Sequence, residues 1–346
     1  MRLGWRVAVC FPVAGICAGV LVSGVFATGV RRDGPLAGTR PSTPRVFAVI
    51  RTPGGVNPTV ELRSGQTGAL LKTVGALGSS WTNNGFAFSP AARSVYLTLI
   101  GHKTLEIERI STDTGARSII ADGEQPAVSF DGRELAFAEG GWASTVLAVR
   151  DFASGRERRL DLAALLGRSY QLMNSSIAWT RDGSAVIVLA AHVAIADAAP
   201  ARAAALTTVG SQTRSCSATP ALLCLIEIPA APGRPLRAER LAPMGTSRGV
   251  QMVTSDGSQP RGALLVSALG FGSAVDRIVL NGPTPRVTRI LSLPKALLVG
   301  VDPSGSRVLY LTEGNKPALW RAQIRAGRLT QARQLIPDVW LEAASW

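Results

Sequence analysis

Histidine is almost missing from this chain, and cysteine is scarce. The 346 residues include only two histidines, His102 and His192, and four cysteines. Neither residue type occurs at the C-x-x-C, H-x-x-x-H or H-E-x-x-H spacings that hold zinc in proteins. The sequence therefore predicts no metal site of recognisable spacing and no bound cofactor.

Lysine is also rare, occurring only at positions 72, 103, 295 and 316, although the formal net charge is +14. Arginine therefore carries nearly all of the positive charge. An excess of positive charge of this size is typical of proteins that contact anionic lipid, wall polymer or nucleic acid. A high-GC codon bias would give the same composition without any such partner. Because the chain has no dense basic run with interleaved aromatic residues, we expect no nucleic-acid binding.

One catalytic pattern occurs, in Gly245 to Gly249, where Ser247 stands at the position of a nucleophile elbow. In hydrolases with this motif the serine lies between a strand and a helix, and the catalytic histidine follows it along the chain. Here both histidines precede Ser247, and a strand-like segment follows it. We therefore expect no catalytic residues and a protein that is not an enzyme.

The N-terminus has an uncharged stretch from Val7 to Val30, closed by Arg31 and Arg32. At about 1.5 Å per residue, a helix over this stretch spans a hydrocarbon core of roughly 30 Å. Residues 1–30 are therefore predicted to be a signal anchor that makes a single-pass membrane protein with its folded part extracytoplasmic. The alternative is a secreted protein, since Val25 to Ala27 would serve as a cleavage site. Residues 31–44, rich in Pro, Gly, Ser and Thr, predict a linker.

A short pattern repeats through residues 45–346: a few apolar residues, a Ser, Thr or Asp, a tight turn, and an apolar strand. Asp-Gly in such a turn is a strong hairpin signal, because glycine accepts the positive φ that the turn needs. A second hairpin follows each first one, so a repeat has four strands. Its length of roughly 40 to 50 residues is that of one β-propeller blade. The repeats begin near Phe86, Ala127, Ile177, Met252 and Gly300.

The two ends of the repeat region complete each other. The first repeat starts at Val46 and lacks an innermost strand, while Leu341 to Trp346 resembles an innermost strand without its hairpin. Pairing these segments closes a ring and leaves no exposed edge. The prediction is an all-β fold, a six-bladed β-propeller of four-stranded blades closed by the C-terminal strand. Insertions are expected near residues 163–175 and 192–220, and counting the second as a blade would make seven.

The hairpins that open the repeats resemble those of the TolB-like, WD-repeat-like propellers. Five of six blade openings are recognisable, and the Asp-Gly itself stands in three of them, at Asp131, Asp182 and Asp256. The resemblance implies a six-bladed propeller outside the cytoplasmic membrane that binds protein or wall-associated partners. A fold of this kind does not fix function.

The residues just ahead of each innermost strand are expected to ring the mouth of the central channel, where propellers commonly bind ligands. Their amides, carboxylates and guanidinium could hold a peptide or a cation. Cys216 and Cys224 lie eight positions apart in an otherwise Cys-poor domain, and we expect a disulfide between them. The candidate ligand-binding residues are Asn83, Asn84, Glu124, Asn174, Arg248 and Glu342.

We expect a non-catalytic, envelope-located module that binds or scaffolds a protein, a peptide or an anionic envelope polymer, with the membrane contacted through residues 7–30. Two alternatives stay open. One is a metal-dependent propeller hydrolase or lactonase, which would gather several carboxylates and amides at one end of the channel. The other is an extracytoplasmic sensor domain that signals through a partner.

Overall fold

The computed structural model describes part of the chain. The described residues are 45–346 except 53–56, 79, 141–143, 167–169, 193–206, 209–222, 245–249, 257–261, 270–271, 280–285, 294–295, 303, 313–315, 327 and 340. The predicted anchor and linker, residues 1–30 and 31–44, lie outside it. In the described part, no helix has the length and apolar character that crossing a membrane requires.

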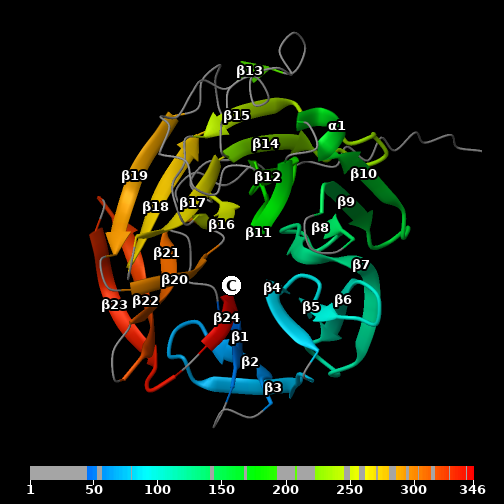
Figure 1. The fold of residues 1–346 in the computed structure, drawn as a ribbon. Coiled ribbons are helices and arrows are strands. Elements are labelled where there is room, and N and C mark those ends of the chain that lie inside the picture. The colour runs from blue at the N-terminus through cyan, green and yellow to red at the C-terminus, as the bar shows by residue number, and fades with distance from the viewer. Residues whose placement is uncertain are drawn as a thin grey trace, which may run out of the picture. The chain divides into compact units, whose positions relative to one another are not determined.

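The described chain is an all-β propeller whose antiparallel sheets stand around a common centre (Figure 1). Most of the sheets have four strands. The first is ordered β24 (Leu341–Ser345), β1 (Val46–Arg51), β2 (Thr59–Ser64) and β3 (Leu70–Ala76). A second is ordered β16 (Val250–Ser255), β17 (Gly262–Leu269), β18 (Gly272–Val279) and β19 (Arg286–Leu293). A third is ordered β20 (Ala296–Val301), β21 (Arg307–Thr312), β22 (Ala318–Arg325) and β23 (Arg328–Ile336).

Two sheets are larger. A five-stranded sheet is ordered β11 (Tyr170–Trp179), β12 (Ala185–His192), β14 (Leu223–Pro229), β15 (Arg240–Met244) and β13 (Thr207–Thr208). A seven-stranded sheet runs from β4 (Trp81–Ser89) through β5 (Ser94–Ile100), β6 (Leu105–Ser111), β7 (Arg117–Val128), β8 (Glu134–Glu139) and β9 (Val146–Asp151) to β10 (Glu157–Asp161). A five-residue helix, α1 (Leu162–Leu166), lies where the first insertion was expected.

The twelve-residue strand β7 joins the two halves of the large sheet. Its first half pairs with β6, from Arg117 opposite Ile110 to Asp122 opposite Glu106. Its second half pairs with β8, up to Val128 opposite Leu135. A new strand was expected near Ala127, where a repeat begins, but the chain passes through Asp122-Gly123 as one continuous strand.

The predicted hairpins at Asp131 and Asp182 form as expected, whereas the turn that follows Asp256 lies outside the described residues. In one, Gly132 has a φ of 71° and its N–H donates to the Ser129 carbonyl at 2.8 Å. The Ser129 hydroxyl donates to Asp131 Oδ1 at 2.7 Å, and the Arg133 N–H donates to the same oxygen at 3.1 Å. A Cβ at Gly132 would also lie 2.8 Å from the Ala92 nitrogen, so both φ and space require glycine.

The core lies between successive sheets. The middle strand β8 is buried on both faces, which explains its nearly continuous apolar sequence. Leu135 and Phe137 pack against Tyr96 and Ile107 of the same large sheet, and Ala136 and Ala138 pack against the sheet that contains β11. The outer strand β3 is mostly exposed. One cluster packs Phe47 and Val49 of β1 against Leu309 and Leu319 of the β20–β23 sheet, with Trp346 between them.

The predicted closure by the C-terminal strand is confirmed. β24 pairs antiparallel with β1, with Ser345 opposite Ala48 and Ala344 opposite Val49. Trp346 is 6% exposed, and its ring centroid lies 5.6 Å from that of Phe47. The first and last described strands therefore belong to one sheet, near the centre of the ring in Figure 1.

Candidate functional site

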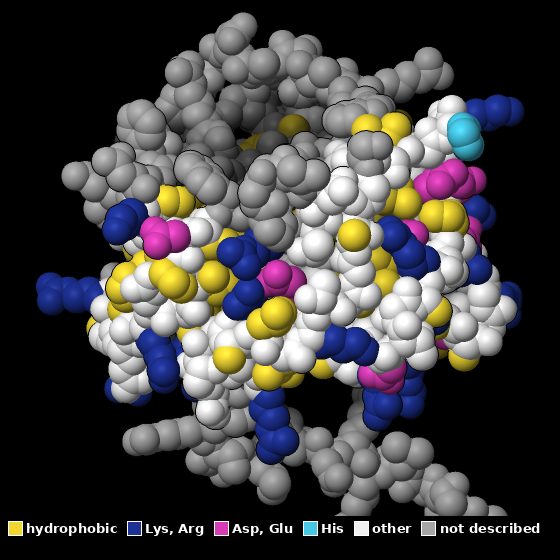
Figure 2. Space-filling view, turned by 90° about the horizontal axis from the view of Figure 1, so that it is seen from below, with side chains coloured by type: hydrophobic (Ala, Val, Ile, Leu, Met, Phe, Trp, Pro, Cys, Tyr) yellow, Lys and Arg dark blue, Asp and Glu magenta, His cyan; other side chains and the backbone are white. Residues whose placement is uncertain are grey.

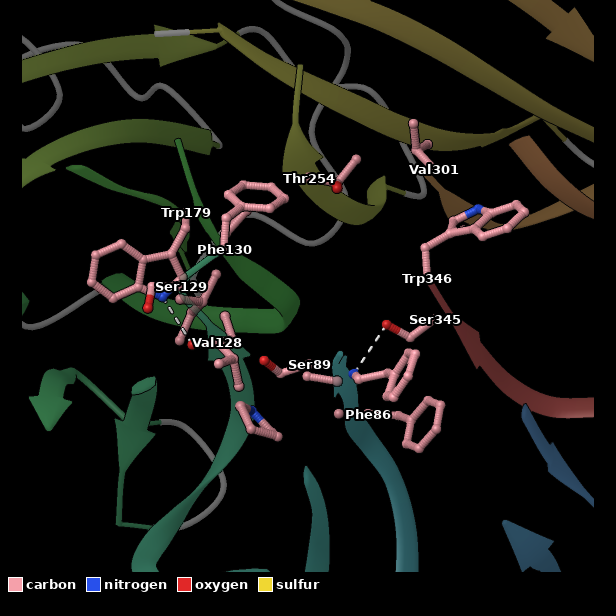
Figure 3. A pocket seen from close by; sticks show the side chains of 18 of the residues that line it. Phe86, Ser89, Val128, Ser129, Phe130, Trp179, Thr254, Val301, Ser345 and Trp346 are labelled. Carbon is pink, nitrogen blue, oxygen red and sulfur yellow. Dashed lines mark hydrogen bonds between the residues drawn. The ribbon is translucent and has the colours of Figure 1, made fainter. Parts of the chain in front are cut away.

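A cavity of about 480 Å³ lies where the innermost strands of the sheets end. This volume is within the range of roughly 300–1,000 Å³ that is usual for ligand pockets. Its lining residues come from β4, β7, β11, β16, β20 and β24 and from the turns that follow them. In the close view the labelled side chains surround one open space, with Trp179 and Phe130 on one side and Trp346 on another (Figure 3).

Each of these strands carries an irregularity where its pairing register shifts. The shifts lie between Trp81 and Phe86 in β4 and between Glu124 and Ala127 in β7. Corresponding shifts occur in β11, β16 and β20 and in the pairing of β24 with β1. A bulge bends a strand and increases its local twist. The cavity extends from the level of these bulges, at Gly85 and Gln125, to the hairpin turns.

Aromatic and aliphatic side chains make up much of the wall. Phe130, in the turn held by Ser129 and Asp131, is 39% exposed at the cavity. Trp179 is only 3% exposed, because its indole N–H donates to the Ala127 carbonyl at 2.9 Å and its ring packs between sheets. Trp179 therefore belongs to the hydrophobic core and also lines the cavity.

Among the described lining residues, Asp302 is the one charged side chain, and its charge is already compensated. The carboxylate is 1% exposed, and its Oδ2 lies 3.2 Å from Arg307 Nη1. Its Oδ1 accepts from the backbone N–H groups of Ser306 and Arg307, each at 3.0 Å. A ligand in the cavity therefore meets a neutral, partly aromatic surface.

Two buried hydrogen-bond donors in this lining have no acceptor among the described residues. The first is Gln125 Nε2. Gln125 is 3% exposed, and its Oε1 accepts from the N–H and the hydroxyl of Ser176 at 3.2 and 3.0 Å. Because a backbone N–H can only donate, this contact fixes the orientation of the amide and leaves both Nε2 hydrogens without a partner.

The second such donor is the indole Nε1 of Trp346. A buried polar group without a partner costs on the order of 1–3 kcal/mol, and such groups call for a specific explanation. Gln125 also has a φ of 59°, which is uncommon for a residue other than glycine. Unmatched donors and an unusual backbone conformation therefore meet in the lining of one cavity.

The predicted ligand residues of the described part lie within the innermost strands. Asn83 and Asn84 are inside β4, Asn174 is inside β11 and Glu342 is inside β24, at or beside the register shifts. Placing Asn83, Asn84 and Asn174 ahead of the innermost strands was wrong, because β4 and β11 begin earlier than the apolar pattern suggested.

Of these residues, Glu124 is the one whose side chain lies in the described part, and it is buried at 3% exposure. Arg248 lies outside the described residues. The cavity was missed because its lining consists of the apolar ends of the strands and of the hairpin turns, which sequence reasoning assigned to folding alone.

The residues on which the disulfide and metal predictions depend lie only partly in the described chain. Cys224 is disulfide-bonded. Its expected partner, Cys216, lies outside the described residues, so the pairing stays a prediction. No group of three or more His, Cys, Asp and Glu side chains that could hold a metal occurs in the described part. The Gly245 to Gly249 motif lies outside that part.

No protein-family model matches the chain, and a search of curated proteins found no match. Solved structures do match. The TolB structure from Acinetobacter baumannii aligns over 87% of this chain with a TM-score of 0.56 and 18% identity. The chain has a TolB-like propeller fold. It spans 66% of that TolB chain, slightly under two thirds of its length.

Other propellers match less closely. A candidate TolB from Agrobacterium tumefaciens has a TM-score of 0.48 and 12% identity, with 84% of this chain and 88% of that one covered. A candidate 6-phosphogluconolactonase from Bacteroides fragilis has a TM-score of 0.45 and 11% identity, with 88% and 99% covered. At such identities the likeness concerns the fold and leaves the activity open.

Proposed function

We propose that this protein is a non-catalytic binding or scaffolding module whose ligand, a protein segment or peptide, enters the cavity at the ends of the innermost strands. The observation that carries the proposal is the pair of donors, Gln125 Nε2 and Trp346 Nε1, left without acceptors in a neutral, aromatic lining. Both nitrogens are buried, so either side chain would turn toward the cavity to donate to a ligand carbonyl, and the apolar wall would bury an uncharged side chain.

The lining argues against catalysis as the main role. General acid–base or nucleophilic chemistry needs a titratable or nucleophilic side chain with an activating partner. Asp302 is held by Arg307 and by backbone N–H groups, and the Ser129 hydroxyl donates to Asp131 within its turn. A metal-dependent hydrolase would need carboxylates and amides that converge on this space.

We further propose that the ring has six blades. In this interpretation the seven-stranded sheet is two blades that share β7, whose halves pair with β6 and with β8. A hydrophobic cluster within that sheet supports the division, because it packs Tyr96 and Ile107 of one half against Leu135 and Phe137 of the other. In the other sheets, clusters of this kind form between successive blades.

The proposed location is extracytoplasmic, with residues 7–30 as a membrane anchor. Fractionation of the native host tests it: intact protein should stay with membranes after a high-salt wash and leave them in detergent. Recovery of the protein from the medium with a new N-terminus near Thr28 would identify a cleaved signal instead.

The binding proposal is tested by filling the cavity. Thr254 lines it and is partly exposed, so Thr254→Trp should occupy the space, whereas Thr288→Trp, on the exposed strand β19, serves as the control. Crosslinked partners from envelope extracts should be recovered with the wild type and with T288W, and lost with T254W, at unchanged melting temperatures. Equal recovery by T254W would refute the site, and lactone or ester turnover that T254W abolishes would favour the enzyme.

A further inference from the structure

Many arginines of the described propeller are paired with carboxylates. Arg63 Nη2 lies 2.6 Å from Glu61, Arg117 Nη2 lies 2.6 Å from Glu108, and Arg159 contacts both Glu139 and Glu157 at 2.6 Å. On the face shown in Figure 2, dark-blue Lys and Arg side chains are spread among apolar ones, and several lie beside magenta carboxylates. Many guanidinium groups outside the β22–β23 hairpin therefore have an acidic neighbour.

The hairpin of β22 and β23 has no such ion pair among the described residues. The two strands contain no Asp or Glu, and their register sets Arg321 opposite Arg333 and Arg325 opposite Arg328. None of these four guanidinium groups makes an ion pair with a described residue. Arg321 donates to the Gly65 carbonyl, and Arg325 Nε donates to Gln323 Oε1 at 3.1 Å.

Like charges directly opposite each other in a sheet are destabilising, so the two pairs need an explanation. Crowding already affects Arg321: burial, followed by repulsion from Arg307 and Arg333, lowers the pKa of its guanidinium below the ordinary value. The remaining three side chains, those of Arg325, Arg328 and Arg333, are exposed. They are open to an external anion.

Two buried carboxylates next to this hairpin are already engaged. Asp302 forms an ion pair with Arg307, which lies on β21, the strand that pairs with β22. Glu61, on the sheet whose Gly65 accepts from Arg321, is 5% exposed and bound to Arg63. The local surplus of positive charge is therefore not balanced by these neighbours.

The spacing of the pairs selects the kind of anion. Arg321 and Arg325 are four residues apart on one strand, which at about 3.3 Å per residue separates the two pairs by roughly 13 Å. One small anion cannot contact both pairs, whereas a linear polymer can. The face of β22 that carries Arg321 and Arg325 also has no aromatic side chain on which nucleobases could stack. Trp320 and Ile324 lie on the opposite face, in a hydrophobic cluster.

We propose that the β22–β23 hairpin binds a linear polymer of phosphate groups through the two arginine pairs, Arg321 with Arg333 and Arg325 with Arg328. Planar guanidinium groups bind phosphate oxygens in a bidentate manner, and the polymer would replace the like-charge contacts by attractive ones. This site is separate from the central cavity, so either proposal can fail while the other stands.

Long-chain inorganic polyphosphate is the probe, with the full-length protein in detergent and affinity followed over a range of salt concentrations. The test variant is Arg325→Gln with Arg328→Gln. The control, Arg93→Gln with Arg133→Gln, removes the same charge from exposed arginines that pair with Asp113 and Asp131 in turns of other strands. Orthophosphate, duplex DNA and vesicles rich in anionic phospholipid are tested in parallel.

The expected result is polyphosphate binding that weakens at least tenfold in the test variant and stays within twofold of wild type in the control. The slope of log affinity against log salt should fall by about one for each arginine that contacts a phosphate. Orthophosphate should bind at least tenfold more weakly than the polymer. Equal losses in both variants, no polyphosphate binding, or tighter variant-sensitive binding to DNA or vesicles would overturn the proposal.

Discussion

Trp346 is the residue on which closure of the ring can be tested most sharply. Its ring is 6% exposed, contacts Phe47 with centroids 5.6 Å apart, and packs in the cluster that joins the first sheet to the β20–β23 sheet. Truncating a buried Trp to Ala typically costs about 3–5 kcal/mol, because both the transfer free energy and the packing are lost. Against a total stability of about 5–15 kcal/mol, Trp346→Ala should remove a large share.

The assay is thermal unfolding followed by calorimetry or circular dichroism. At about 2–4 °C per kcal/mol for domains of 150–250 residues, W346A should lower the Tm by at least about 6 °C. Trp346→Phe keeps a ring against Phe47 and should lose clearly less. Truncation after Val339 also removes the pairing of β24 with β1 and the bond from the Phe88 N–H to Ser345 Oγ at 3.2 Å, and should give aggregation or protease sensitivity. If the truncated protein melts within about 2 °C of the intact one, the reasoning on closure is wrong.

Three further predictions concern the cavity, the disulfide and acid stability. Gln125→Glu keeps an oxygen that accepts from Ser176 but replaces the Nε2 donor, which has no partner, by a carboxylate oxygen. The variant should therefore bind the captured ligand at least tenfold more weakly. Unchanged affinity would exclude a contact between the ligand and Gln125. Non-reducing mass spectrometry of exported protein should find Cys216 linked to Cys224, and free alkylation of both would exclude that pair. Hydrogen bonds from the Ser154 N–H and hydroxyl lower the pKa of Asp151, so Asp151 stabilises the fold above its unfolded pKa, and this contribution is lost as the pH falls through the lower folded value. The stability difference between wild type and Asp151→Ala should therefore shrink below about pH 4, and a constant difference would contradict the assignment.

The repeat was predictable because each hairpin depends on local chemistry. Asp131 and Gly132 act through contacts within a few residues, so the sequence alone reports them. Closure was also predictable, since Val46 and Leu341 stand at the ends of an incomplete repeat. These features need no knowledge of how distant strands lie in space.

The cavity and the β22–β23 hairpin depend on how segments far apart in the sequence lie in space. The role of Gln125 depends on its hydrogen bond with Ser176, fifty-one residues away, and on the bulge that leaves Gln125 unpaired between β7 and β8. Likewise, the register that sets Arg321 opposite Arg333 includes an irregularity within β23 that the apolar pattern does not show. Bulges shift a register by one residue, and that shift exchanges the faces on which all later side chains lie.

Methyl NMR on valine-labelled protein tests the central claim, that ligand enters the cavity at the ends of the innermost strands. Val128, Val299 and Val301 line this space, whereas Val95 and Val186 are fully buried in hydrophobic clusters between sheets. On titration with the partner captured from envelope extracts, the methyl signals of the three cavity valines should shift and those of the two buried valines should stay in place. Saturating partner that leaves the signals of Val128, Val299 and Val301 unmoved would contradict the claim.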